Sequence, residues 1–529
     1  MAADVKRIVK RYKNLKSERG TWDSHWREIA DLTYPRRSDF DTKRSPGEKR
    51  QTKVFDSTAI QANELLASGM VGLNINPASK WFVPDTDDMA EDAKMWLVKA
   101  GDIMLDEINT AKAGFYTSAY EYFLEFGAFG TAAMAIMEAS DGNGINCQSR
   151  ALSEIVISEG PEGLVDTIYR RFQWPAHRIF AKWGDKSGEQ VLKAMQADKP
   201  DTKFFIIHCI QPRSDRDKKK KTAVNLPFEE TYVVEKDEHI LEEGGFHEMP
   251  IPVGRFYKSP METYGRSPAM TALPEIKMLN EVMKTTIKAA QKSVDPPLIM
   301  PNDGFLNPLR TVPGGINVFD GSVNDAIGQL PSANPNIGLD FVELLRDSIR
   351  SMFFVDQLQF AGGPQMTATE VLQRTEEKLR LMGPILGRVQ TEFLGPVLDR
   401  IFGILLRQGK FGPTPESLPD SFEFKYTSQV TQAQRQSEAN GFLRGVEVIS
   451  PLLQINPQLL TDNVDANKTI RDTFEMFGVS PDKFNPEKQV DVVQQQRAQI
   501  QQLSQALELA QQGGEAGQAL NQATTQEGA

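Results

Sequence analysis

The stretch Trp22-Asp-Ser-His-Trp26-Arg-Glu-Ile29-Ala30, which continues to Tyr34-Pro35-Arg-Arg, is the most informative part of this chain. Its apolar residues recur at intervals of three and four, the spacing that places side chains on one face of a helix. The residue before a proline is pushed out of the α region, so the helix is expected to end at Tyr34-Pro35. The stretch therefore predicts a helix whose buried face is formed by Trp22, Trp26, Ile29 and Ala30.

A second stretch begins at Phe55-Asp-Ser-Thr-Ala59 and runs through Leu65-Leu-Ala-Ser-Gly-Met70 to Lys80-Trp-Phe82. Residues 56–58 offer side chains that cap a helix start. The helix that follows carries its apolar residues on one side, and we expect Gly69 and Gly72 to interrupt it. On packing grounds the two stretches form two docked helices and a loop.

Composition narrows the classes of protein. The chain has 529 residues, which is enough for several domains, and 40% of them are hydrophobic. Its net charge of -11 argues against a protein that coats nucleic acid, but not against one that DNA slides past. The two cysteines, Cys147 and Cys209, form neither a disulfide framework nor a zinc site, and they favour assembly in a reducing place. We expect neither a signal peptide nor a membrane span.

No catalytic motif stands out. The chain lacks a phosphate-binding Gly-x-x-x-x-Gly-Lys-Ser/Thr string, a Gly-x-Ser-x-Gly elbow and a His-Glu-x-x-His pair. His239 and His247 lie in a Glu-rich segment, so they are either solvated side chains or part of a metal site. We expect no enzyme activity, no cofactor and no metal.

The N-terminal part, up to about residue 135, is expected to be mostly helical. Residues 115–137 are rich in aromatic and small residues and predict a buried helix. From about 147 to 256 the pattern changes to short β-rich runs separated by Gly, Pro and charged residues. The expected strands include residues 155–157, 167–169, 204–207 and 231–234.

Three long helices follow. The first opens with Ser267-Pro268, a cap followed by proline at the first helical position, and runs to about Ser293. A Pro/Gly/Asn-rich segment, 296–338, separates it from a second helix at about 340–355. The third begins at a capping box, Thr367-Ala-Thr-Glu370, and continues to about Gln408. We expect Gly383-Pro384 and Gly395-Pro396 to kink the third helix.

The first two of these helices each have an apolar stripe. The stripe of the first consists of Leu273, Ile276, Leu279, Met283, Ile287 and Ala290. The stripe of the second consists of Phe341, Leu344, Leu345, Ile349 and Phe353. Both stripes are expected to face inward.

The two N-terminal stretches, together with Tyr264-Gly265-Arg266-Ser267-Pro268, resemble the head-to-tail connector (portal) proteins of short-tailed double-stranded DNA phages. The resemblance spans about residues 20–410. It implies an α+β, mainly helical portal fold with a wing, a two-helix stem, a small clip, a long kinked wing helix and a helical crown. The implied parts are a wing (1–266), stem helix 1 (267–295), a clip (296–338), stem helix 2 (339–358), a tunnel loop (359–366), the kinked helix with the wing return (367–428), and a crown with a C-terminal helix (429–512). Composition predicts that residues 513–529 are disordered.

The resemblance also implies a function. Subunits would form a ring, a homododecamer of about twelve copies, at one capsid vertex. The ring would conduct double-stranded DNA non-specifically during packaging and ejection. Implied partners are the major capsid protein, the scaffolding protein, the terminase large subunit and tail adaptor or tail tube proteins, with no membrane. The implied location is the virion, after assembly in the host cytoplasm.

Three groups of residues are candidates for contact with DNA or a neighbouring subunit. An uncharged segment is either the implied tunnel loop, which would lie against DNA, or a flexible interhelical loop; it comprises Phe360, Ala361, Gly362, Gly363, Pro364, Gln365 and Met366. A stripe on the first stem helix comprises Lys277, Lys284, Lys288 and Lys292, which either line the channel or form a solvated face. A basic run comprises Arg213, Arg216, Lys218, Lys219, Lys220 and Lys221, which is either a solvated hairpin loop or a contact for DNA or another subunit.

Two other functions remain open at this point. A DNA-processing enzyme would need a convergent set of carboxylates or histidines, which the sequence does not show. A tail or internal virion protein that binds only neighbouring subunits would not need two long helices around a Pro-rich tip.

Overall fold

The computed structural model describes chiefly residues 4–40, 47–85, 89–217, 222–294, 339–358, 382–419 and 422–426, with short stretches elsewhere. The chain divides into two compact units. The first comprises residues 1–90 and 99–430, and the second comprises 91–98 and 431–529. The first unit mixes helices with antiparallel sheets, which confirms the α+β class.

Five helices precede the first long strand. They are α1 (Val5–Glu18), α2 (Gly20–Thr33), α3 (Thr58–Asn74), α4 (Glu91–Asn109) and α5 (Phe115–Phe129). Helix α2 ends one residue before Tyr34-Pro35, as predicted. Trp26, Ile29 and Ala30 are fully buried, and Trp22 is partly buried. The buried face predicted for this helix is therefore confirmed.

Helix α3 corrects one expectation. It runs without interruption through Gly69 and Gly72. A Cβ atom at Gly69 would lie 2.7 Å from the side chain of Leu358, so glycine allows close packing at this position. At the helix start, Asp56 Oδ1 accepts a hydrogen bond of 2.9 Å from the Thr58 amide. The predicted capping segment is thus used, with Asp56 as the acceptor.

The predicted buried helix over residues 115–137 was wrong in its second half. Helix α5 ends at Gly130, which has the positive φ of 73° that helix ends favour. The chain then forms β2 (Thr131–Glu138), whose first six residues are buried. A short apolar run bounded by glycine fits a buried strand as well as a helix, so periodicity alone does not distinguish them.

A five-stranded antiparallel sheet is formed within the region from 155 to 246. Its order is β4 (Ile155–Glu159), β5 (Val165–Pro175), β6 (Lys203–Pro212), β7 (Phe228–Val234) and β8 (His239–Phe246). All four strands predicted for this region are confirmed.

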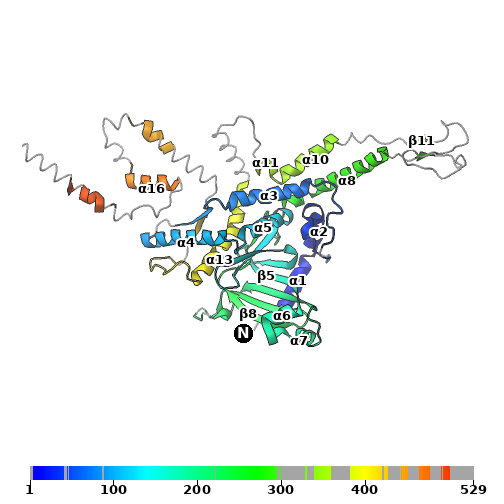
Figure 1. The fold of residues 1–529 in the computed structure, drawn as a ribbon, viewed down its shortest axis with the longest axis horizontal. Helices are drawn as coiled ribbons and strands as arrows, with labels where there is room; N and C mark the ends of the chain where they lie inside the picture. Colours follow the sequence, from blue (N-terminus) through cyan, green and yellow to red (C-terminus); the bar gives the residue numbers. More distant parts are fainter. Residues whose placement is uncertain are drawn as a thin grey trace, which may run out of the picture. The chain divides into compact units, whose positions relative to one another are not determined.

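Helices cover both faces of this sheet. Helix α1 packs on one face, where Ile8 and Tyr12 meet Tyr169. Helices α6 (Ala176–Trp183) and α7 (Glu189–Gln196) pack on the other, where Ile179 and Val191 lie in one cluster with the sheet. Figure 1 shows α6 and α7 beside β8.

The described residues form three smaller sheets as well. Strand β2 lies between β3 (Ile145–Arg150) and β9 (Val253–Arg255). Strand β1 (Phe82–Pro84) pairs with β12 (Phe424–Tyr426). Strand β10 (Leu298–Ile299) pairs with β11 (Gly328–Gln329) within the Pro/Gly/Asn-rich segment. Short 3-10 turns occur at Pro35–Arg37, Leu152–Glu154, Gly184–Ser187 and Ala223–Asn225.

Two long helices lie side by side and antiparallel (Figure 1). They are α8 (Pro268–Val294) and α10 (Leu339–Met352), and a short α11 (Val355–Leu358) follows. The bounds match the predicted helices except at the end of α10. There the chain turns at Phe354, which has a φ of 58°.

The predicted apolar stripes are only partly inward. On α8 the residues up to Leu279 are buried, but Ile287 is 40% exposed. On α10, Leu345 and Ile349 are buried, whereas Phe341 is 45% and Leu344 is 69% exposed. The expectation for Phe341 and Leu344 was wrong because the packed side of α10 covers a narrower arc than its apolar residues span. The expectation for Ile287 and Ala290, which are both exposed, was wrong because burial on α8 ends lengthwise, before the outer part of the helix.

A helical region covers residues 382–407 of the first unit. Residues 382–389 are helical, Gln390–Leu394 form a π-turn, and α13 (Gly395–Arg407) continues the helix. The amide of Gly395 donates to the Gln390 carbonyl, five residues back. The distortion predicted at Gly395-Pro396 is therefore a π-turn, which accommodates the missing proline donor. The capping box at 367–370 lies outside the described residues.

The second unit contains α16 (Ala466–Met476) and a helical stretch at 492–497. Residues 513–529 lie outside the described part of the chain. None of the described helices combines the length and the apolar character needed to cross a membrane.

Candidate functional site

Two of the stretches singled out in the sequence, Trp22–Ala30 and Tyr264–Pro268, meet where α8 begins. Trp26 from α2 lies edge-on against Tyr264, with ring centroids 5.1 Å apart. The indole Nε1 of Trp26 donates a 3.1 Å hydrogen bond to the carbonyl of Phe129, at the end of α5. These residues therefore hold α2, α5 and the start of α8 together.

Ser267 caps α8 in the way the sequence predicts. Its Oγ accepts from the Met270 amide at 3.0 Å and donates to the Ala128 carbonyl at 2.8 Å. The side chain of Ser267 is fully buried. The first turn of α8 is thus fixed to the end of α5 as well as capped.

Two glycines allow the backbone to pass closely beside this cap. A Cβ atom at Gly265 would lie 2.2 Å from the Gly130 carbonyl oxygen, and one at Gly130 would lie 2.5 Å from the Gly265 carbonyl oxygen. Real Cβ atoms do not come this close, so only glycine fits at either position without a shift of the backbone.

A buried ionic cluster ties the same region to the π-turn. The Arg255 guanidinium, only 1% exposed, donates two hydrogen bonds of 2.9 Å to the carboxylate of Glu392. The Arg255 amide donates to the same carboxylate at 3.0 Å, and Glu159 forms a further ion pair with Arg255. Sequence reasoning missed this cluster, because its members are far apart in the chain and follow no local motif.

The α8 lysines differ in their surroundings. Lys277 forms an ion pair with Glu28 of α2, and Lys284 forms one of 3.0 Å with Glu281. Lys288 and Lys292 are exposed and have no ion-pair partner within the part of the chain that the structure describes. The structure therefore divides the predicted stripe into two engaged and two available lysines.

The basic run lies between β6 and β7, as the hairpin reading predicts. Arg213 is mostly buried and donates to the Gly244 carbonyl at 2.8 Å. Arg216 is partly exposed, and Lys219 and Lys220 are exposed. Lys220 lies 3.7 Å from the carboxylate of Asp217. Lys218, Lys221 and the predicted tunnel loop, Phe360 to Met366, lie outside the described residues.

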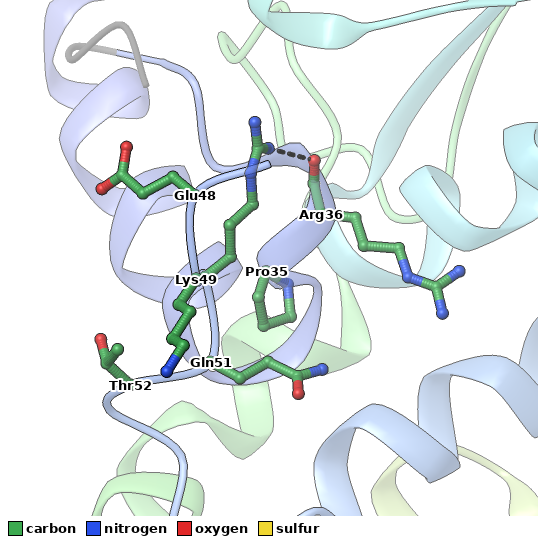
Figure 2. Close-up of a pocket in the computed structure, with 7 residues that line it drawn as sticks. Pro35, Arg36, Glu48, Lys49, Gln51 and Thr52 are labelled. Atoms are coloured by element: carbon green, nitrogen blue, oxygen red, sulfur yellow. Dashed lines mark hydrogen bonds between the residues drawn. The ribbon is translucent and has the colours of Figure 1, made fainter. Parts of the chain in front are cut away.

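A hollow of about 500 Å³ lies beside the turn that follows α2 (Figure 2). It is lined by Pro35, Arg36, Glu48, Lys49, Arg50, Gln51 and Thr52. Arg50 donates to the Arg36 carbonyl, but the side chains of Arg36, Glu48 and Lys49 point in different directions. A ligand site needs polar groups that converge on one point. The hollow has none, so it is not a candidate active site.

Three buried titratable residues, His208, Cys147 and Cys209, belong to the core. His208 is buried, stacks on Tyr232 with centroids 4.0 Å apart, and lies 3.0 Å from Glu230. Burial lowers the pKa of His208, so its ring stays neutral. Burial raises the pKa of the Cys147 and Cys209 thiols to about 12, which makes both poor nucleophiles. Within the described residues no group of His, Cys, Asp and Glu is arranged to hold a metal ion.

The sequence is similar to known proteins over almost its whole length. Residues 5–484 match the family model described as bacteriophage head to tail connecting protein. The chain is 31% identical to a probable portal protein of Bordetella phage BPP-1, over 96% of this chain and 94% of the relative. It is 30% identical to the portal protein of Salmonella phage epsilon15, over 99% of this chain and 96% of the relative. The chain therefore belongs to the family of bacteriophage head-to-tail connecting proteins.

Proposed function

We propose that copies of this chain form a closed ring at one vertex of a phage capsid and that double-stranded DNA passes through it. The similarity to two phage portal proteins over almost the whole chain carries this proposal. Head-to-tail contacts between identical subunits close into a ring when the rotation fits, and the family implies about twelve copies. The ring is a conduit and a docking platform with no reaction of its own.

The parts of the fold receive roles accordingly. Helices α8 and α10 are the two stem helices, and residues 296–338 between them are the clip. The β10–β11 pair and the antiparallel course of the two helices support this assignment. Residues 1–266 form the wing, 367–428 its return, and 429–512 the crown with the C-terminal helix.

Partners follow from the same proposal. The ring sits among major capsid proteins, assembles with the scaffolding protein, and docks the terminase large subunit during packaging. Tail adaptor or tail tube proteins replace the terminase afterwards. An alternative is a structural virion protein that contacts only neighbouring subunits. The β10–β11 pair, which lies in the segment between the two long helices, favours the portal role.

Contacts with DNA or with a neighbouring subunit are proposed for three places. The segment Phe360–Met366 is the tunnel loop and touches DNA without charge. The exposed lysines of the β6–β7 connection are a second candidate. On α8, the engagement of Lys277 and Lys284 within the chain leaves Lys288 and Lys292 for an outside partner.

Electron microscopy of the purified chain tests the proposal directly. With 59.1 kDa per chain, a ring of about twelve copies has a mass of about 710 kDa. We expect annular particles with a central hole, and light scattering should report this mass. A stable monomer or dimer at every salt concentration would reject the ring.

A further inference from the structure

Helix α10 carries an exposed acidic edge. Asp340, Glu343 and Asp347 follow one another at intervals of three and four, so they share one side of the helix. With about 100° per residue, this side lies opposite the buried side formed by Leu345 and Ile349. The acidic edge therefore faces away from α8 and from the core.

The acidic residues are open to an outside partner. Asp340 is exposed and has no ion-pair partner among the described residues. Glu343 pairs with Arg346 and Asp347 with Arg350 on the same helix, but both carboxylates remain more than half exposed. Exposed pairs of this kind contribute little stability and exchange easily.

Helix α8 carries a basic edge. Lys284, Lys288 and Lys292 recur every four residues, at about 80–160° from the buried side of the helix. Lys288 and Lys292 have no ion-pair partner within the described residues, on α10 or elsewhere. This edge also points away from the packed side.

The two edges lie at a similar level of the helix pair. Asn280 of α8 and Arg346 of α10 both bind the segment 53–56, which places them side by side. Moving outward from these residues, Lys288 lies about 12 Å along α8 and Asp340 about 9 Å along α10, at 1.5 Å per residue. The helix pair thus has a basic edge and an acidic edge at matching levels.

Exposed apolar residues accompany the acidic edge. Phe341 is 45% and Leu344 is 69% exposed, although their neighbours Val342 and Leu345 are buried. Leaving two large apolar side chains in water gains nothing for the subunit alone. A surface that covers them would recover this free energy.

We propose that the basic α8 edge of one subunit docks on the acidic, partly apolar α10 edge of the next copy of this chain. The inference rests on the proposed ring, because a head-to-tail contact needs two different and complementary surfaces. It assigns Lys288 and Lys292 to the subunit contact. A protein partner accounts for the apolar pair beside the charges, whereas DNA would gain nothing from Phe341 and Leu344.

A charge swap tests the pairing of the edges. Lys288→Glu with Lys292→Glu should reduce the ring fraction about tenfold or more at low salt, because like charges then face each other. Asp340→Lys with Glu343→Lys should do the same. Mixing the two double variants should restore rings, in which the two chains alternate. Lys10→Glu with Lys13→Glu, on the exposed side of α1, makes the same change of charge elsewhere and should leave the rings unchanged.

Neutral variants show whether a loss of rings comes from the subunit contact or from a folding defect. Lys288→Ala with Lys292→Ala should weaken the ring and reduce its sensitivity to salt, while the thermal unfolding of the free subunit stays unchanged. If the reversed lysines leave assembly intact but lower DNA retention, these residues face DNA and the edge pairing is wrong. If mixing the double variants does not restore rings, the pairing is also wrong. A wild-type chain that forms no ring would instead reject the proposed function itself.

Discussion

The close packing of the region before α8 depends on two glycine residues. Gly130 and Gly265 let two backbone segments pass at a distance that a Cβ atom would prevent. We expect Gly265→Ala to lower the free energy of unfolding by about 1–3 kcal/mol, since the backbone would have to shift. Urea denaturation of the full chain measures this change.

Gly72→Ala is the matched control. Gly72 lies within α3, and a Cβ atom there would meet nothing within 4 Å. Alanine should therefore stabilise the helix by up to about 1 kcal/mol. If Gly265→Ala behaved like Gly72→Ala, the close approach would have no energetic importance.

Glu125 is a second residue with a measurable signature. It is buried in α5, accepts a 3.0 Å hydrogen bond from the Leu152 amide and lies 3.3 Å from Arg37. Burial raises the pKa of Glu125 to about 7, and the charge of Arg37 only partly opposes this. A carboxyl with a raised pKa stabilises the fold at low pH, and this stabilisation is lost as the pH rises through about 7.

Glu125→Gln removes this titration. Between pH 4.5 and 7.5 the stability of the variant relative to wild type should rise by about 1–3 kcal/mol, because only the wild type must ionise a buried group. The variant keeps an acceptor for the Leu152 amide, and other titrating groups cancel in the difference. Urea midpoints at several pH values measure it, and a difference that does not change with pH would contradict the prediction.

Residue roles could be predicted where they depend on local spacing. The burial of Trp26 and the cap at Ser267 follow from short-range patterns. The pairing of Arg255 with Glu392 could not be predicted, because 137 residues separate them and no motif marks either one. Long-range polar contacts depend on the completed fold, so a single sequence gives no signal for them.

At the scale of whole elements, α8 and α10 show what periodicity can and cannot tell. The positions of both helices follow from apolar spacing and, for α8, from the cap and proline at Ser267-Pro268. The apolar arc of α10 is wider than its buried side, so the sequence alone assigned Phe341 and Leu344 to the core. Packing against α8 and α3 buries Leu345 and Ile349, as predicted, and adds Val342, which the predicted stripe did not include.

The distinction between these two sides can be measured in the free subunit. Ile349→Ala should lower the free energy of unfolding by about 2–5 kcal/mol, because it removes fully buried atoms and leaves a cavity. Leu344→Ala should change it by less than about 0.5 kcal/mol, because most of that side chain already contacts water. Equal losses for the two variants would mean that the free subunit covers Leu344.

At the scale of the whole molecule, the family could be identified from three short strings, whereas the architecture of the subunit needed the structure. Two of the strings, Trp22–Ala30 and Tyr264–Pro268, lie where α2 and the start of α8 meet the end of α5, and this close packing restricts what residues can stand there. The acidic edge of α10 and the basic edge of α8 contain no recognisable sequence string. Their residues are exposed and charged, which in a single sequence is the pattern of any solvated helix.

The segment from Phe360 to Met366 is proposed to act in the passage of DNA through the ring. It follows α11 and precedes the helical residues that begin at Met382, and its Gly362-Gly363 pair permits backbone angles that other residues avoid. Gly362→Ala with Gly363→Ala should leave ring assembly normal, because the buried faces of α8 and α10 are formed without this segment. The stiffer segment should follow passing DNA less well, so packaging or retention of DNA should fall. Rings that package and hold DNA at the normal level would make the segment a plain connector, and chains that fail to assemble would make it structural.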